Sequence, residues 1–230
     1  MSSVSALKLE SRRPLSDLDF IYTELKQFCM IGEFEPGQKL TLSDLAEVFG
    51  TSHMPIREAL SRLVAARALD APPRRSICVP QATVERLDAL LPLRVLLEAQ
   101  ATELAATRAD AQTLRDLRDI DDAMDSPAQK ANLKAYLRLN QQFHFTVYRA
   151  CGNEDLIDLI ELLWMRYGPL LNVVRGGVLS ASGHAHHGEV IAGLIARDGA
   201  AAAQAMRADI RDAAISIRAA ISRDAISQGA

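Results

Sequence analysis

The spacing of apolar residues along the first 80 positions predicts three short helices followed by a small β-hairpin. Apolar residues recur every three or four positions over 17–30, 41–49 and 54–66, as on one face of a helix. Gly50 follows the second segment, where a glycine often ends a helix. The segment 76–79 has strand character, and a preceding strand near 68–71 completes the predicted hairpin.

After Pro80 the pattern changes to long helical segments rich in alanine and leucine, without a strand signal. We expect Pro92 to kink or split the first of these helices, because proline removes a hydrogen bond and clashes with the preceding turn. The predicted helices cover 83–107, 110–125, 130–151, 153–174, 184–198 and 200–225.

The second and third predicted helices have the arrangement of a helix-turn-helix, because a tight turn at 50–52 joins them and the third is rich in arginine. Their facing sides are formed by Leu42, Leu45, Phe49, Ile56, Leu60 and Leu63. The outward face can enter the major groove of DNA, and the turn at 74–75 is placed as a wing against phosphates or the minor groove. The candidate DNA-binding residues are Ser52, His53, Met54, Arg57, Ser61, Arg74 and Arg75. A helical hairpin with a solvated charged face is the alternative.

The predicted fold class is therefore mainly α, in two parts. An N-terminal winged helix-turn-helix of three helices and a small β-hairpin covers 15–80, after a flexible tail over 1–14. An all-α bundle of six to seven helices covers 83–226. Hydrophobic residues make up 49% of the chain, which is enough to bury a sizeable core in each part.

Charge and cysteine content narrow the function classes. The net charge is −3, but residues 51–80 carry five arginines against two acidic residues, a local excess that a DNA backbone attracts. Cys29, Cys78 and Cys151 form no CxxC pair or disulfide framework and are expected to be buried apolar residues. The chain has no apolar run long enough to span a bilayer and no apolar signal core, so we expect a cytoplasmic protein without a membrane partner.

Three motifs in the N-terminal part resemble the GntR family of bacterial repressors. They are PGQKL at 36–40, LAEVFG at 45–50 and SHMPIREAL at 52–60, in the order and spacing of the family. The resemblance implies a winged helix-turn-helix regulator that binds a palindromic operator in double-stranded DNA as a homodimer. His53 stands where the family usually has an arginine that contacts DNA, and Ser76 where its wing usually has a glycine. Both departures bear on which operator bases the chain reads.

The helical part offers a candidate metal site. Asn140 and His144 are four residues apart on a helical segment, so their side chains share one face. His187 and Asp209 lie on two later helices among apolar neighbours. Four converging groups of this kind can bind a divalent metal. A hydrogen-bonded core histidine at 144 and a polar helix start around 184–187 are the alternatives.

Residues 85–220 resemble the FCD domain, the all-helical effector module of FadR-type GntR regulators. The matching pieces are RVLLE at 94–98, FH at 143–144, GN at 152–153 and the segment 187–198. The resemblance implies metal ligands at Asn140, His144, His187 and Asp209, with an amide and a carboxylate replacing the usual aspartate and third histidine. It also implies that zinc, manganese or nickel helps to bind a small carboxylate metabolite as the effector. Arg94 is a candidate effector-binding residue, or else a member of an interhelical salt bridge.

Two functions remain in competition at this stage. The first is a transcriptional regulator, a repressor in our interpretation, whose operator binding responds to the carboxylate effector. The second is a metal-dependent hydrolase that uses His144, His187 and Asp209 to activate water. The sequence has no HExxH motif, nucleophile elbow or phosphate loop, so we expect a regulator and not an enzyme.

Overall fold

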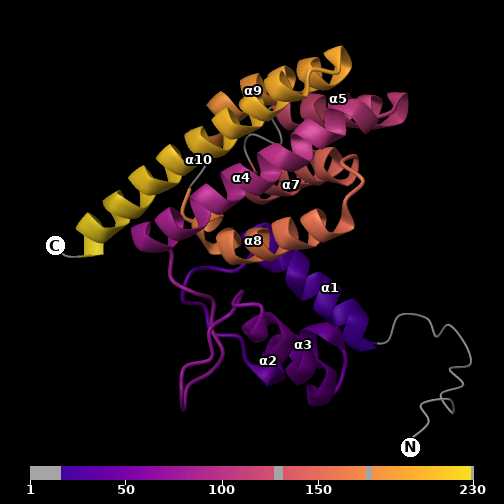
Figure 1. Cartoon of the computed structure of the whole chain (residues 1–230). Helices are drawn as coiled ribbons and strands as arrows, with labels where there is room; N and C mark the ends of the chain where they lie inside the picture. Colours follow the sequence, from indigo (N-terminus) through magenta and orange to yellow (C-terminus); the bar gives the residue numbers. More distant parts are fainter. Residues whose placement is uncertain (1–16, 127–131, 175–177, 229–230) are drawn as a thin grey trace, which may run out of the picture.

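The computed structural model describes residues 17–126, 132–174 and 178–228, and within the last range it describes side chains over 185–223. These residues form helices almost throughout (Figure 1), which confirms the mainly α fold class. The predicted tail, residues 1–14, lies outside the described residues. The helices are α1 Asp17–Met30, α2 Leu42–Phe49, α3 His53–Ala65, α4 Val84–Arg108, α5 Ala111–Asp125, α7 Leu133–Arg149, α8 Glu154–Asn172, α9 Val178–Ala196 and α10 Gly199–Gln228.

Local sequence signals fix the two helices of the helix-turn-helix. The Thr41 side chain accepts a hydrogen bond from the backbone N–H of Asp44 and so caps the start of α2. Gly50 ends α2 in the left-handed conformation, at φ 61°, which costs glycine little. The chain then turns into α3, whose inner residues Ile56, Leu60 and Leu63 are fully buried. The predicted turn at 50–52 is therefore present.

The wing is smaller than the predicted hairpin. Cys78 pairs with Asp70 and with Lys39 through isolated antiparallel bridges, and the described residues contain no longer strand. Backbone hydrogen bonds from Leu40 to Ile77 and from Val79 to Gln38 extend the pairing toward α2. The two prolines at 72–73 and the exposed arginines beside them occupy the tip, where they leave little room for a regular ladder.

The C-terminal part is a bundle of long helices. A capping side chain accepts a hydrogen bond from the backbone N–H three residues ahead at the starts of α4, α5, α7 and α8, at Thr83, Asp110, Asn132 and Asn153. The predicted split of the first helix is wrong, because α4 continues through Pro92 for 25 residues. Pro92 is exposed, whereas Leu90 and Arg94 on the opposite side of this turn are buried, and their packing holds it helical. Helices α4 and α10 run side by side in opposite directions (Figure 1).

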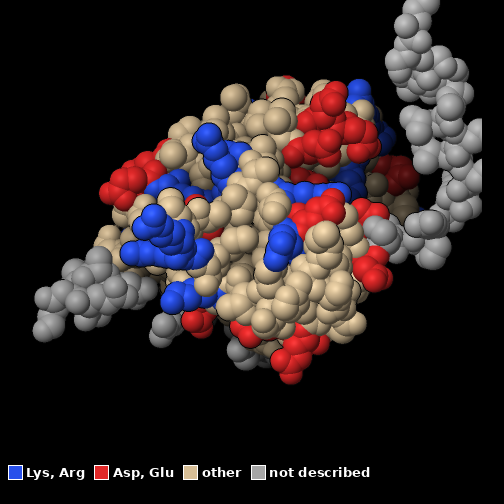
Figure 2. All heavy atoms as spheres, turned by 90° about the horizontal axis from the view of Figure 1, so that it is seen from below, with Lys and Arg blue, Asp and Glu red and all other residues tan. Residues whose placement is uncertain are grey.

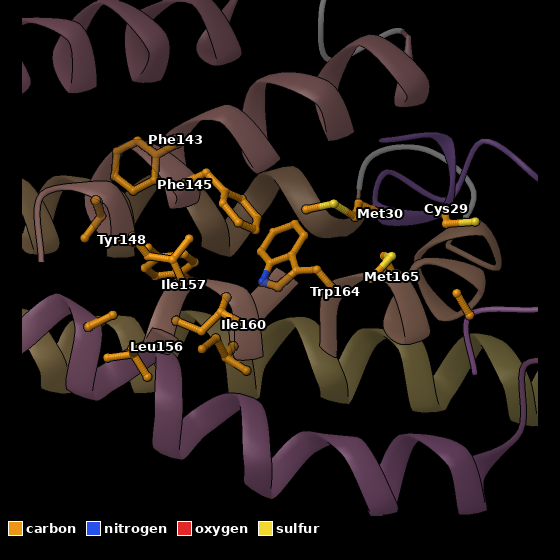
Figure 3. Packing of buried hydrophobic residues seen from close by; sticks show 14 of the residues in the cluster. Cys29, Met30, Phe143, Phe145, Tyr148, Leu156, Ile157, Ile160, Trp164 and Met165 are labelled. Carbon is orange, nitrogen blue, oxygen red and sulfur yellow. The ribbon is translucent and has the colours of Figure 1, made fainter. Parts of the chain in front are cut away.

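The division into two parts stays a prediction, because their hydrophobic residues form one contiguous cluster. Trp164 and Met165 on α8 lie between the aromatic residues of α7 and the end of α1, where Cys29 and Met30 are buried (Figure 3). Gly168 allows this close approach, since a Cβ at this position would overlap the carbonyl oxygen of Cys29. Helices α8 and α1 are therefore in direct contact at this point.

We expect Gly168→Ala to lower the free energy of unfolding by about 3 kcal/mol or more, because α1 and α8 must separate to admit the methyl group. The measurement is urea-induced unfolding followed by circular dichroism. The matched control is Gly188→Ala on α9, where a Cβ has open space and alanine is the better helix former. Equal stability of the two variants would show that α8 does not need this contact.

Candidate functional site

The outer face of α3 presents the residues that sequence analysis assigned to DNA. Ser52, His53, Arg57 and Ser61 are exposed, and Met54 is 70% exposed. The opposite face is buried against α1 and α2, so the helix is held firmly while its polar face stays open. This is the arrangement that allows a helix to enter the major groove.

The two arginines of α3 have different surroundings. Arg62 contacts Glu58 at 2.9 Å, lies 3.8 Å from Asp19 and covers the ring of Tyr22 on α1. Among the described residues, Arg57 has no hydrogen bond or ion pair for its side chain. Arg57 is therefore the α3 arginine whose five N–H donors are available to a ligand.

The arginines of the wing are exposed as well. Arg74 adopts a positive φ of 61° at the tip, and Arg75 follows in a turn closed by its N–H to the carbonyl of Pro72 at 3.1 Å. Figure 2 views the molecule from below and shows basic side chains in separate patches with uncharged and acidic surface between them. Charge alone therefore does not identify the DNA-binding surface. The position of the arginines on α3 and the wing identifies it instead.

Three of the four predicted metal ligands converge inside the bundle. His144 on α7, His187 on α9 and Asp209 on α10 each offer a ligand atom within 4.8 Å of the others. The His144 Nε2 lies 3.3 Å from Asp209 Oδ2, and the His187 Nε2 lies 3.9 Å from Asp209 Oδ1. All three side chains are buried. The fourth, Asn140, lies one turn before His144 and lines the same cavity as His144 and Asp209.

Hydrogen bonds on the far side of each ring orient the histidines. The His187 Nδ1 faces the Asp121 carboxylate at 3.2 Å, and its ring stacks on Phe143 with centroids 3.8 Å apart. The His144 Nδ1 lies 2.9 Å from the hydroxyl of Tyr148. The Nε2 atoms therefore face the centre of the cluster. A partner on the remote nitrogen is typical of metal-binding histidines, because it fixes the ring and its tautomer.

The centre of this cluster fits a cation. When His187 donates its Nδ1–H to Asp121, its Nε2 faces inward, and this buried atom has no hydrogen-bond partner in the described part of the chain. Burial lowers the pKa of His144 and so favours its neutral form. Burial alone would raise the pKa of Asp209, but the contact with His144 outweighs it and the carboxylate stays ionised. Two imidazoles and one carboxylate are a donor set that divalent transition metals accept.

Arg94 lies at the wall of this cavity, but it is already paired. Its guanidinium donates to both carboxylate oxygens of Glu98, at 2.6 and 3.0 Å, and is held between the rings of Trp164 and Tyr167. Burial disfavours its charge, yet the Glu98 carboxylate raises the pKa of Arg94 overall. The expected salt bridge is thus present within α4 and not between helices. The predicted contact of Arg94 with an effector stays a prediction.

Sequence analysis missed Asp121, Tyr148 and Glu98 as polar partners of the cluster. Asp121 lies on the face of α5 that buries Leu117, Ile120 and Met124, so an acidic residue at an apolar helical position was the available signal. Tyr148 and Glu98 each stand four residues after a site residue, His144 and Arg94, at a spacing that brings side chains together on a helix.

Comparison with known proteins separates the functional alternatives. Residues 18–79 match the bacterial regulatory proteins of the gntR family, and residues 89–212 match the FCD domain. The second match alone spans more than half of the chain. The chain belongs to the GntR family of regulators and carries an FCD domain.

The individual relatives agree with this assignment. The chain is 31% identical to the HTH-type transcriptional regulator McbR of Escherichia coli over 166 residues, which cover 72% of this chain and 75% of McbR. It is 27% identical to the transcriptional repressor GlaR of E. coli over 81% of this chain and 89% of GlaR. The structure of E. coli McbR/YncC superposes with a TM-score of 0.79 at 28% identity, over 86% of this chain and 95% of that one.

This GntR-family protein is a DNA-binding transcriptional regulator and not an enzyme. The hydrolase alternative has no support, because the family and the relatives named above are regulators. GntR regulators typically act as dimers. In the described part of the chain, no helix is long and apolar enough to cross a membrane.

We expect Arg57→Ala to weaken specific operator binding by roughly 1–3 kcal/mol, the usual scale of a bidentate arginine–guanine contact. The measurement is a gel-shift titration at fixed salt with the upstream DNA of the chain's own gene and with an unrelated duplex. Arg62→Ala is the control, because it removes the same charge from a side chain that faces α1. Equal losses for the two variants would indicate that α3 contributes only net charge.

Proposed function

We propose that this regulator is a homodimeric repressor that releases a palindromic operator when a small carboxylate metabolite binds inside the FCD domain beside a divalent metal. The observation that carries the proposal is the buried convergence of two imidazole Nε2 atoms on one carboxylate. The cluster lies in the domain that regulators of this type use for their effector, while α3 and the wing remain free for DNA.

His144, His187 and Asp209 would hold the metal, and Asn140 would add an oxygen ligand from the same cavity wall. When bound, a divalent metal supplies a Lewis-acidic centre that accepts carboxylate oxygens. The set of two nitrogen and two oxygen donors is harder than three histidines with one carboxylate, so manganese and nickel are candidates beside zinc. The histidines contribute orientation as well, because Asp121 and Tyr148 hold their rings from behind.

The size of the cavity supports a response that involves movement. Its volume is about 30 Å³, and its wall includes Arg94, Tyr136 and Trp164. That volume holds an ion and about one or two waters, whereas sites for small molecules commonly measure about 300 Å³ or more. A metabolite therefore has to displace side chains of the wall. Trp164 and Leu171 bring α8 into that displacement.

Helix α8 connects this cavity directly to the end of the recognition helix α3. Trp164 faces the cavity, and two residues later the Arg166 Nε donates a hydrogen bond to the carbonyl of Ala66, at the end of α3, at 2.8 Å. Arg86 on α4 donates to the carbonyl of Arg166 at 3.0 and 3.1 Å and so fastens this junction. Displacement of α8 by the metabolite would therefore shift the end of the recognition helix.

Removal of a ligand should remove the metal. We expect protein purified without chelator to carry a divalent metal in elemental analysis, and His144→Ala to carry much less. His186→Ala is the matched control, because His186 contacts Asp212 and Glu189 outside the cluster and should retain the metal. Equal metal content in the two variants would exclude this cluster as the binding site.

The regulatory proposal is tested by a thermal-shift screen of small carboxylates with and without added zinc, manganese or nickel, because bound ligands stabilise the folded state by mass action. We expect a carboxylate that raises the melting temperature to weaken operator binding in a gel shift. In Arg166→Ala the same carboxylate should still raise the melting temperature, but should change operator affinity by a smaller factor. Release that is as large in this variant as in the wild type would exclude the Arg166 junction, and a carboxylate that binds without release would exclude the repressor proposal.

A further inference from the structure

A chain of buried hydrogen bonds runs from the predicted metal site to Arg94. The hydroxyl of Tyr148 lies 2.9 Å from His144 Nδ1 and donates a short hydrogen bond to Glu98 Oε2. Glu98 in turn accepts both hydrogen bonds from Arg94. The four side chains come from α4 and α7, and each is at most 4% exposed. Water cannot rearrange their protons freely, so each partner restricts the next.

The order of donors along this chain determines the state of His144. A tyrosine hydroxyl has one proton to donate, and the nearby Glu98 carboxylate is a stronger acceptor for it than the Met206 sulfur at 3.5 Å. Burial and the Glu98 carboxylate both raise the pKa of Tyr148, which keeps the hydroxyl protonated. The lone pairs of the hydroxyl oxygen are then left for His144, so the contact at 2.9 Å needs the proton of the imidazole on Nδ1. With Nδ1–H directed to Tyr148, Nε2 is the ring atom that faces Asp209, at 3.3 Å, and that can bind a metal placed between the two residues.

We propose that Tyr148 is a positioning residue for the metal site, which holds His144 in the tautomer whose Nε2 can bind the metal, and that Glu98 and Arg94 keep Tyr148 in that role. The proposal rests on the metal site of the proposed function and adds a second set of residues to it. Arg94 acts here through charge, because an unpaired Glu98 carboxylate would be costly in this buried position.

The two histidines differ in the partner that lies behind Nδ1. His187 has a carboxylate, Asp121, behind its Nδ1, and a carboxylate can only accept a hydrogen bond. A hydroxyl can either donate or accept, so Tyr148 alone does not fix the tautomer of His144. Glu98 removes that freedom by taking the hydroxyl proton. The two histidines thus reach the same tautomer by different means.

The test compares Tyr148→Phe with Tyr167→Phe. The hydroxyl of Tyr167 is also buried but makes no hydrogen bond to His144 or Glu98 in the described part of the chain, and phenylalanine keeps the ring that covers Arg94. We expect Tyr148→Phe to weaken Zn²⁺ binding by roughly 10- to 100-fold in a chelator-competition titration, the usual effect of losing such a partner. Tyr167→Phe should bind Zn²⁺ as the wild type does, and the melting temperatures of the metal-free variants report any general loss of structure.

A second measurement uses the wild-type chain and does not depend on a variant that folds. In ¹⁵N-labelled, Zn²⁺-loaded protein, two-bond ¹H–¹⁵N spectra should give His144 a protonated Nδ1, because Tyr148 accepts that proton while Nε2 binds the metal. An unprotonated Nδ1 in the Zn²⁺-loaded protein would overturn the proposal, and so would equal Zn²⁺ affinity in the two phenylalanine variants. If the wild type binds neither Zn²⁺, Mn²⁺ nor Ni²⁺, the metal site of the proposed function fails together with it. If the wild type binds metal and Tyr148→Phe binds it equally well, only the role of Tyr148 fails.

Discussion

The pairing of Arg94 with Glu98 is the interaction on which the interior of the FCD domain depends. Either charge alone would be costly at this depth, because burial removes it from water and only the partner supplies two hydrogen bonds in return. With Arg94 and Glu98 paired, Glu98 orients Tyr148, and Tyr148 orients His144. The His144 Nε2 then faces Asp209. A buried ion pair of this kind adds little to stability, and its value here lies in the arrangement that it imposes on its neighbours.

Helix α8 connects the buried polar residues of the FCD domain to the N-terminal helices. Its aromatic residues enclose Arg94, while Arg166 and Gly168 meet the ends of α3 and α1. A helix transmits displacement along its length because its backbone hydrogen bonds are already satisfied internally. Met30 on α1 and Met165 on α8 belong to one hydrophobic cluster, so the two parts of the chain pack against each other. The proposed metabolite site and the DNA-binding helices are thus linked through packed residues of α8.

The elements of this chain could be predicted largely from its sequence, because helical periodicity and capping residues such as Thr41 and Gly50 are local signals. The continuity of α4 through Pro92 could not, since it depends on the helices around it. The wing was overestimated because strand propensity at 76–79 says nothing of the pairing partner. Three of the four predicted metal ligands do lie close together, but the contact of Asp121 with His187 depends on which helix faces which. Such contacts over long sequence separations have no local signature.

In the proposed function, the small size of the cavity affects the metabolite concentration at which the regulator responds. If only a fraction of molecules has the cavity open, the apparent dissociation constant equals the intrinsic constant divided by that fraction. Substitutions that loosen the cavity wall would therefore lower the apparent dissociation constant without contacting the metabolite. Substitutions that tighten the packing of Trp164 or Leu171 would raise it. Sensitivity to the metabolite can thus be tuned through the stability of the closed bundle, which leaves the chemistry of recognition unchanged.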